Sequence, residues 1–188
     1  MDIIECLETK RSVRNYRDEV IPSEIMKRLI ELGTMASTGS NMQPWGFVVI
    51  QDKNEINEMS EKIKKELLAN LEAYPHLMQY KDWLENPKYS VFNHASNLLI
   101  IYGNKESYYY REDCSLCAGN IMLAAHSMDI GSCWIGFAEY HVNTLEFKKE
   151  YNVPENYDLV CAMTLGYKKV ELTPPKRKEA VIFKHQIS

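Results

Sequence analysis

The sequence has 188 residues, of which 45% are hydrophobic and 26% charged, and its formal net charge is -4 at pH 7. These values predict a single globular domain over residues 1–188 with a substantial core, and they exclude a disordered chain. The mildly acidic balance argues against nucleic acid and anionic membranes as partners, and no apolar run reaches the roughly 18 residues of a membrane span.

Two further features concern the cellular compartment. Asp2 and Glu5 stand where a secretory signal peptide needs basic residues, so we expect no export. The five cysteines, at positions 6, 114, 117, 133 and 161, are odd in number, and the chain is too long for a disulfide miniprotein. Reduced thiols in a cytoplasmic protein are the simplest interpretation.

The chain begins with a short predicted helix and a cluster of cations. Asp2 and Glu5 have capping-box spacing ahead of Ile3 and Ile4. The segment that follows, Lys-Arg-Ser-Val-Arg-Asn-Tyr-Arg at 10–17, places four cations within eight residues of an acidic protein. By itself this is most simply a solvated basic patch. The alternative is an anion site, because the planar fork of arginine donors suits a phosphate.

A helix and a polar loop come next. Pro22 and Glu24 are typical of a helix start, and apolar residues recur at helical spacing from 25 to 36. Gly33 within this helix predicts close packing. The loop Ser-Thr-Gly-Ser-Asn-Met-Gln at 37–43 then leads into a buried strand at 45–50. Its composition favours an ordinary turn after a helix, with a ligand-binding loop as the alternative.

The rest of the chain alternates between helices and strands. We expect helices from 54 to about 72, over 111–128 and after a cap formed by Asn143 and Glu146, and strands at 96–102, 132–137 and 157–167. The helix over 111–128 is apolar on most sides, so we expect it in the middle of the protein or in a subunit interface, with Gly131 at its end. The segment 74–89 is the least regular and is typical of a lid or binding loop. The alternation predicts an α/β or mixed α+β sandwich without fixing the strand order.

Several kinds of catalytic site find no support in the sequence. No Gly-x-Gly-x-x-Gly or Gly-x-x-x-x-Gly-Lys motif is present, so a Rossmann or P-loop nucleotide site is not expected. The histidines are scattered, and Cys114 and Cys117 have no second cysteine pair, so we predict no metal site. An apolar helix continues through both cysteines, which favours buried, inert thiols. The sequence contains no Gly-x-Ser-x-Gly motif, the nucleophile elbow of many hydrolases, so a hydrolase of that type is not expected.

The cations at 10, 11 and 14 and the loop at 37–43 remain, and flavin mononucleotide (FMN) would need both. Its phosphate, with nearly two negative charges, matches Arg and Lys side chains. The pyrimidine edge of its ring presents alternating donors and acceptors, with which amides such as Asn41 and Gln43 can pair. A cation or donor near N1 would favour the reduced flavin. Composition alone leaves the solvated patch and the ordinary turn as open alternatives.

At three places the chain resembles the FMN-dependent nitroreductase family: Lys-Arg-Ser-Val-Arg-Asn-Tyr at 10–16, Ser-Thr-Gly-Ser-Asn-Met-Gln-Pro-Trp at 37–45 and Gly-Ser-Cys-Trp-Ile-Gly at 131–136. A weaker fourth is Pro-Pro-Lys-Arg-Lys at 174–178, and the resemblance covers nearly the full length. It implies an α+β sandwich with a central, mixed but mostly antiparallel sheet flanked by helices. It also implies a homodimer with two FMN sites at the subunit interface.

The resemblance assigns residues to this FMN site. The first segment would contact the phosphate, the ribityl chain and the pyrimidine edge, the loop would come from the partner subunit, and the third segment would offer backbone groups near flavin N5. The tail cations would reach the phosphate. The cofactor-binding residues expected on this basis are Lys10, Arg11, Ser12, Arg14, Ser37, Thr38, Gly39, Asn41, Gln43, Ile135, Gly136, Lys176 and Arg177.

The chain departs from the family pattern at two positions. Lys10 stands where the family usually has Arg, which keeps the charge but loses bidentate pairing. Ser37-Thr38 stands where the family usually has Pro-Ser, which keeps a hydroxyl but removes the proline that stiffens the loop. Flavin affinity or loop mobility is therefore expected to differ from that of the relatives.

The resemblance implies a two-electron reaction by a ping-pong mechanism. NADH or NADPH would give hydride to flavin N5, and a nitroaromatic, quinone or similar small-molecule acceptor would then be reduced. The chemistry belongs to the cofactor, so we expect no catalytic side chain. A second hypothesis is an FMN-binding carrier or sensor on the same fold without reductase turnover. A third is a related flavin reaction, such as dehydrogenation of a heterocycle or reductive dehalogenation.

Overall fold

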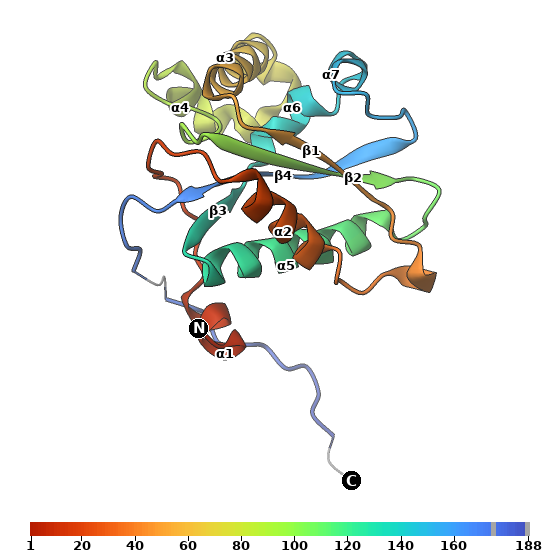
Figure 1. The fold of residues 1–188 in the computed structure, drawn as a ribbon. Coiled ribbons are helices and arrows are strands. Elements are labelled where there is room, and N and C mark those ends of the chain that lie inside the picture. The colour runs from red at the N-terminus through yellow and green to blue at the C-terminus, as the bar shows by residue number, and fades with distance from the viewer. Residues whose placement is uncertain (174–175, 187–188) are drawn as a thin grey trace.

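The computed structural model describes residues 1–173 and 176–186, and its centre is a four-stranded antiparallel sheet (Figure 1). The strands are β1 (Trp45–Ile50), β2 (Asn97–Asn104), β3 (Ile130–Trp134) and β4 (Tyr157–Tyr167), in the order β1-β2-β4-β3. Every neighbouring pair is antiparallel, and an isolated bridge between Ser12 and Ser132 adds one parallel contact. The predicted α+β sandwich with a mostly antiparallel sheet is therefore confirmed.

Helices cover both faces of this sheet (Figure 1). One face carries α2 (Ser23–Gly33) and α5 (Tyr110–Ser127), and α1 (Ile3–Thr9) lies at the far end of α5. The other face carries α3 (Lys53–Ala69), α4 (Lys81–Glu85), α6 (Glu139–Val142) and α7 (Leu145–Glu150). Short 3-10 turns occupy Gly39–Asn41, Leu71–Ala73, Pro75–Tyr80 and Gly136–Ala138.

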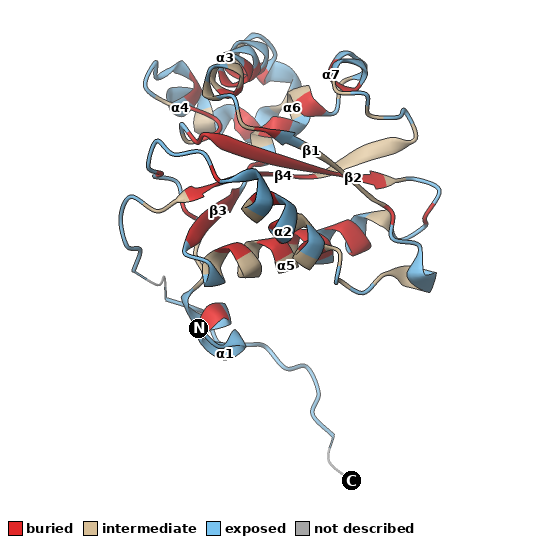
Figure 2. Ribbon diagram, in the orientation of Figure 1, coloured by how far each residue is buried: buried red, intermediate tan, exposed pale blue. Residues whose placement is uncertain are grey.

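Alternating side chains of the inner strands form two separate cores. Along β2, Leu98, Ile100 and Tyr102 pack with α3 on one face, whereas Leu99 and Ile101 pack with α2 and α5 on the other. This is the two-residue period of a strand that is covered on both sides. In Figure 2 the inner strand β2 is accordingly buried along nearly its whole length.

Helix α5 packs closely on α2 but is covered on one side only. A Cβ added at Gly33 would lie 2.5 Å from Cγ1 of Ile121, which confirms the close packing predicted for this glycine. On the opposite side, Leu116 is 53% exposed and a Cβ at Gly119 would meet nothing within 4 Å. Within the described residues α5 is therefore a surface helix with an uncovered apolar face. In that same part of the chain, no helix is both long and apolar enough to cross a bilayer.

Two expected element ends were wrong. Gly131 does not end α5, because the chain reverses at Asp129, whose φ is 62°, and Gly131 lies within β3. Asp tolerates the left-handed region better than most residues, so no glycine is needed there. The strand predicted at 132–137 runs only from Ile130 to Trp134, because the next residues turn into the 3-10 segment Gly136–Ala138.

Two further expectations also need correction. The cap of α7 is Thr144, whose side chain accepts a hydrogen bond from the backbone N–H of Phe147, while the Asn143 side chain accepts from the N–H of Leu159 on β4. A tertiary hydrogen bond thus occupies the Asn143 side chain, which the local sequence predicted to be the helix cap. The segment 74–89 is not irregular, because it contains the 3-10 turn Pro75–Tyr80 followed by α4.

Candidate cofactor site

The basic segment at 10–14 is fastened to the free edge of β3. The backbone N–H of Val13 donates to the carbonyl oxygen of Ser132 at 3.0 Å, and Val13 is buried. The buried Tyr16 hydroxyl donates to the Val13 carbonyl at 2.6 Å. Because side chains alternate along an extended segment, Ser12 and Arg14 on either side of Val13 are exposed. The sheet therefore fixes the backbone from which these polar side chains project.

A first cavity, of about 410 Å³, lies over this segment, and we call it the basic cavity. Its lining residues are Lys10, Arg11, Ser12, Arg14, Leu172, Thr173 and Arg177. Four of them are cations, and within residues 1–173 and 176–186 none of the four forms a salt bridge. Arg177 of the tail thus lies beside the segment, whereas Lys176 does not line the cavity.

The cations of the basic cavity raise one another's electrostatic energy. Burial lowers the pKa of Lys10, and the neighbouring charges of Arg11 and Arg177 lower it further. The guanidinium of Arg11 donates to the carbonyl oxygens of Lys10 at 2.5 Å and Glu8 at 2.6 Å, but its Nε is buried without a partner. Uncompensated cations and an orphaned donor together favour binding of an anion.

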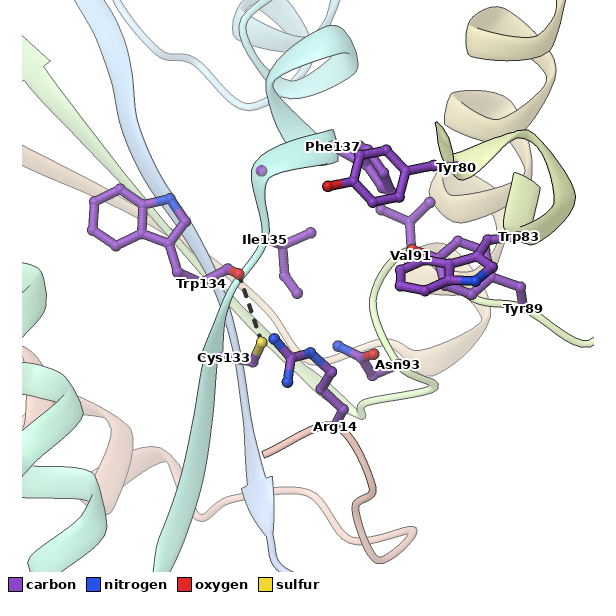
Figure 3. Close-up of a pocket in the computed structure, with 11 residues that line it drawn as sticks. Arg14, Tyr80, Trp83, Tyr89, Val91, Asn93, Cys133, Trp134, Ile135 and Phe137 are labelled. Carbon is purple, nitrogen blue, oxygen red and sulfur yellow. Dashed lines mark hydrogen bonds between the residues drawn. The ribbon is translucent and has the colours of Figure 1, made fainter. Parts of the chain in front are cut away.

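A second cavity, of about 630 Å³, shares Arg14 with the basic cavity, and Figure 3 shows the residues that line it. We call it the aromatic cavity. Its lining residues are Arg14, Tyr80, Trp83, Tyr89, Val91, Asn93, Cys133, Trp134, Ile135, Gly136 and Phe137. The ring centroids of Tyr80 and Trp83 are 5.4 Å apart, and those of Tyr80 and Phe137 are 5.3 Å apart. A wall of aromatic rings beside one cation suits a flat ligand.

Ile135 and Gly136 line this cavity where the chain leaves β3. The N–H of Ile135 donates to the carbonyl oxygen of Ala162 at 2.8 Å, which fixes the backbone where it leaves the sheet. A Cβ at Gly136 would meet nothing within 4 Å, so the backbone there faces open space. The turn after β3 therefore presents main chain rather than side chain to a ligand.

Asn93 is a candidate that sequence reasoning missed. Asn93 and His94 have φ of 55° and 53°, a left-handed pair that turns the chain just before β2. Figure 3 shows the Asn93 amide beside Arg14 at the edge of the aromatic cavity. Asn is over-represented at left-handed positions, so its place before a buried strand was an available but weak signal. The aromatic lining from 80 to 89 was anticipated only as a lid or binding loop.

The cysteines contribute no reactive thiol to the site. All five are free and buried, and burial raises the pKa of Cys114 and of Cys117 to about 12. Cys133 lines the aromatic cavity, and burial raises the pKa of its thiol as well. The neutral form therefore prevails at ordinary pH, which confirms the buried, inert thiols predicted for the Cys-x-x-Cys pair.

No residue of the loop at 37–43 lines either cavity. In Figure 1 the loop lies at the opposite end of α5 from α1. The N–H of Gly39 donates to Oδ1 of Asp113 near the start of α5, whereas Nζ of Lys10 contacts Sδ of Met122 near its end. Nine helical residues separate these two contacts, which corresponds to about 14 Å. Within one chain, Ser37, Thr38, Gly39, Asn41 and Gln43 thus do not join the other predicted residues.

Known proteins share this architecture. Residues 7–167 match the model of the nitroreductase family. A nitroreductase with bound FMN from Bacteroides fragilis is 26% identical and has a TM-score of 0.80, covering 100% of this chain and 99% of its own. A protein of Methanothermobacter thermautotrophicus named "Putative NADH dehydrogenase/NAD(P)H nitroreductase" is 28% identical over 167 residues, 89% of this chain and 78% of its own.

A second branch of relatives carries a different name. An iodotyrosine deiodinase of Thermotoga neapolitana is 23% identical over 187 residues and covers 96% of each chain. The sequence match to the family spans most of the chain and includes the basic segment from Lys10 and the β3 turn. The chain therefore belongs to the nitroreductase family.

Proposed function

We propose that the protein is an FMN-dependent oxidoreductase that uses NADH or NADPH to reduce a nitroaromatic, a quinone or a similar small acceptor. The observation that carries the proposal is the pair of adjoining cavities, one basic and one aromatic, that meet at Arg14. The FMN-bound nitroreductase from Bacteroides fragilis, which is similar over its full length, supports the cofactor. The name of the Methanothermobacter relative supports a nicotinamide reductant.

The residues of the basic cavity fit the phosphate end of FMN. Lys10, Arg11 and Arg177 would hold the phosphate, with Ser12 beside the ribityl chain. The buried Nε of Arg11 would gain the hydrogen-bond partner that it lacks in the described structure. Side-chain cations therefore take the part that a glycine-rich loop plays in other phosphate sites.

The residues of the aromatic cavity fit the ring end. Arg14 and Asn93 would pair with the pyrimidine edge, and the backbone at Ile135 and Gly136 would run beside the ring. The aromatic wall would exclude water from the face on which reductant and acceptor bind. When bound, FMN supplies the two-electron redox chemistry, and this chain supplies position and electrostatics. With FMN bound in this way, Arg14 would place positive charge near the ring, where reduction increases negative charge.

A homodimer is part of the proposal, because one chain does not assemble all the predicted residues. The loop at 37–43 contacts the beginning of α5 through Gly39, whereas Lys10 of the basic cavity contacts Met122 near the end of the same helix. The outward face of α5 exposes Leu116 and the open position Gly119, and this face suits contact with a second copy. The loop of that copy would complete the FMN site. A cytoplasmic location completes the proposal, and five free cysteines support it.

Reductive dehalogenation of a halogenated aromatic compound is the second candidate. It is favoured by the iodotyrosine deiodinase from Thermotoga neapolitana, which aligns over 96% of both chains. Both candidates need the same cofactor and the same aromatic cavity, so they differ only in the acceptor. A carrier or sensor that holds FMN without turnover remains the outcome to test against both.

The decisive experiment is the visible spectrum of the purified protein, before and after anaerobic addition of NADH or NADPH. We expect a bound flavin that bleaches with either reductant and recovers its colour when a nitroaromatic or quinone is added. Recovery with 3-iodotyrosine in place of these acceptors would favour the second candidate. A protein that binds FMN but bleaches with neither reductant would be a carrier or sensor, and a protein with no affinity for FMN would contradict the whole proposal.

A further inference from the structure

The loop at 37–43 has a backbone conformation that its sequence does not favour. Ser40, Asn41 and Gln43 have φ of 51°, 55° and 48°, so three residues with a Cβ are left-handed within a stretch of four. Asn tolerates this conformation, but at Ser40 and Gln43 it costs free energy and persists only where the surrounding structure imposes it. The amide of Gln43 donates to the Asn41 side chain at 3.0 Å, but this bond lies within the loop and does not anchor it. Contacts from outside the loop must therefore hold it.

The anchoring contact comes from the beginning of α5. Oδ1 of Asp113 accepts a hydrogen bond from the backbone N–H of Gly39 at 3.0 Å. The ring of Tyr109 lies so close to Gly39 that an added Cβ would be 2.8 Å from its Cδ2. Gly39 is thus fixed between a carboxylate and an aromatic ring, immediately before the left-handed run begins.

Asp113 has no other evident partner in the described part of the chain. It is 4% exposed, it forms no salt bridge there, and its Oδ2 is buried without a hydrogen bond. A buried polar atom without a partner is rare and calls for an explanation. The position in the first turn of α5 favours a negative charge and offsets part of this cost. The hydrogen bond from the Gly39 N–H is therefore the contact that accounts for a buried carboxylate at this position.

We propose that Asp113 is a positioning residue for the flavin site: it holds Gly39 and thereby presents the amides of Asn41 and Gln43 to the FMN bound by a second copy of the chain. This inference rests on the function proposed above.

The test compares three variants of the full chain. Asp113→Ala removes the acceptor, Asp113→Asn keeps an oxygen at the same place, and Glu112→Ala removes an exposed carboxylate from the same helical turn. The first measurement is hydrogen exchange of the Gly39 amide in the FMN-free protein. We expect protection in the wild type, a loss of at least tenfold in Asp113→Ala, and changes below twofold in the other two variants.

The second measurement is the FMN dissociation constant of the same proteins. We expect an increase of 5- to 50-fold in Asp113→Ala, with rescue to within twofold in Asp113→Asn. A general loss of stability would lower affinity in both substitutions and would not be rescued. Should Asp113→Ala fail to fold, Asp113→Ser replaces it, because its shorter side chain cannot reach Gly39.

Failure of this inference is distinguishable from failure of the proposed function. An unprotected Gly39 amide in the wild type would overturn the clamp without any variant. Equal FMN affinity in Asp113→Ala and the wild type would overturn the positioning role while leaving FMN binding established. A wild type that binds no FMN would instead overturn the proposed function, and the positioning role with it.

Discussion

Arg14 is the residue on which the proposed FMN site depends most directly, since it lines both cavities. Figure 3 shows its side chain at the aromatic cavity. Arg14→Ala removes an exposed side chain that forms no salt bridge within the described residues. The backbone beside it stays fastened, because the hydrogen bond of Val13 to Ser132 involves main-chain atoms only. We therefore expect the FMN-free protein to keep its stability to within about 0.5 kcal/mol.

The loss of FMN affinity can be sized from the kind of contact that Arg14 would make. One charge-assisted hydrogen bond contributes about 1.5–3 kcal/mol, which is roughly a 10- to 160-fold change in the dissociation constant. Two unit charges about 4 Å apart at a protein surface attract by about 4 kcal/mol, but the exposure of Arg14 screens this attraction. Arg14→Lys keeps the charge and loses the planar fork, so its effect should be smaller.

The assay is titration of the FMN-free protein with FMN, followed by flavin fluorescence, together with thermal unfolding of each variant. Arg17→Ala is the matched control, because Arg17 is exposed on the same segment and its Nε donates to the Lys168 carbonyl at 3.1 Å, outside both cavities. Arg17→Ala should bind FMN like the wild type. Equal affinity in Arg14→Ala and the wild type would refute the assignment of Arg14 to the site.

Three other predictions concern packing, titration and thiols. Gly131→Ala would place a Cβ 2.6–2.8 Å from three atoms of Val13. The clash should lower the free energy of unfolding by about 1–3 kcal/mol and weaken FMN binding by moving the basic segment. An unchanged melting temperature would contradict this prediction. The pKa of Lys10 lies below its ordinary value of 10.5, so FMN affinity should fall as rising pH removes the proton from the Lys10 amine. Lys10→Arg should abolish this fall between neutral pH and pH 10, because the guanidinium stays charged. An identical fall of affinity in the variant would contradict the assignment to Lys10. A thiol reagent should leave the folded protein unmodified, because burial keeps Cys114 and Cys117 protonated, and should modify all five cysteines after denaturation.

The parts of the fold that were predictable from sequence are those decided by burial pattern. The strands at 45–50 and 157–167 match β1 and β4 residue for residue, because apolar runs bounded by turn formers report a strand directly. The helix ends that depend on tertiary contacts were not predictable from the sequence. Local rules favour Asn143 over Thr144 as the cap, but the Asn143 side chain accepts a hydrogen bond from Leu159 on another element, and Thr144 caps the helix instead.

The cations of the candidate site give a signal in the sequence, whereas the shape of the site gives none. Lys10, Arg11 and Arg14 stand out as cations in an acidic chain, and the structure gathers them with Arg177 around one cavity. Asn93 and the aromatic wall carry no comparable signal. An aromatic residue in a sequence is as consistent with a core as with a ligand pocket, and only the packing of Pro75–Tyr80 and α4 over the end of β3 decides between them.

The position of the loop constrains the form of the proposed dimer. In one chain, Asp113 anchors the loop at the beginning of α5, and Met122 contacts Lys10 near its end. In a two-fold dimer, each contact is made twice with the roles exchanged. Two α5 helices that pack antiparallel bring the loop of each copy to the cations of the other, so both sites are completed together.

A parallel pair would instead bring loop to loop and cations to cations, where like charges repel. The proposed FMN sites therefore require antiparallel pairing of α5, and a substitution that separates the two copies should weaken FMN binding at both sites at once.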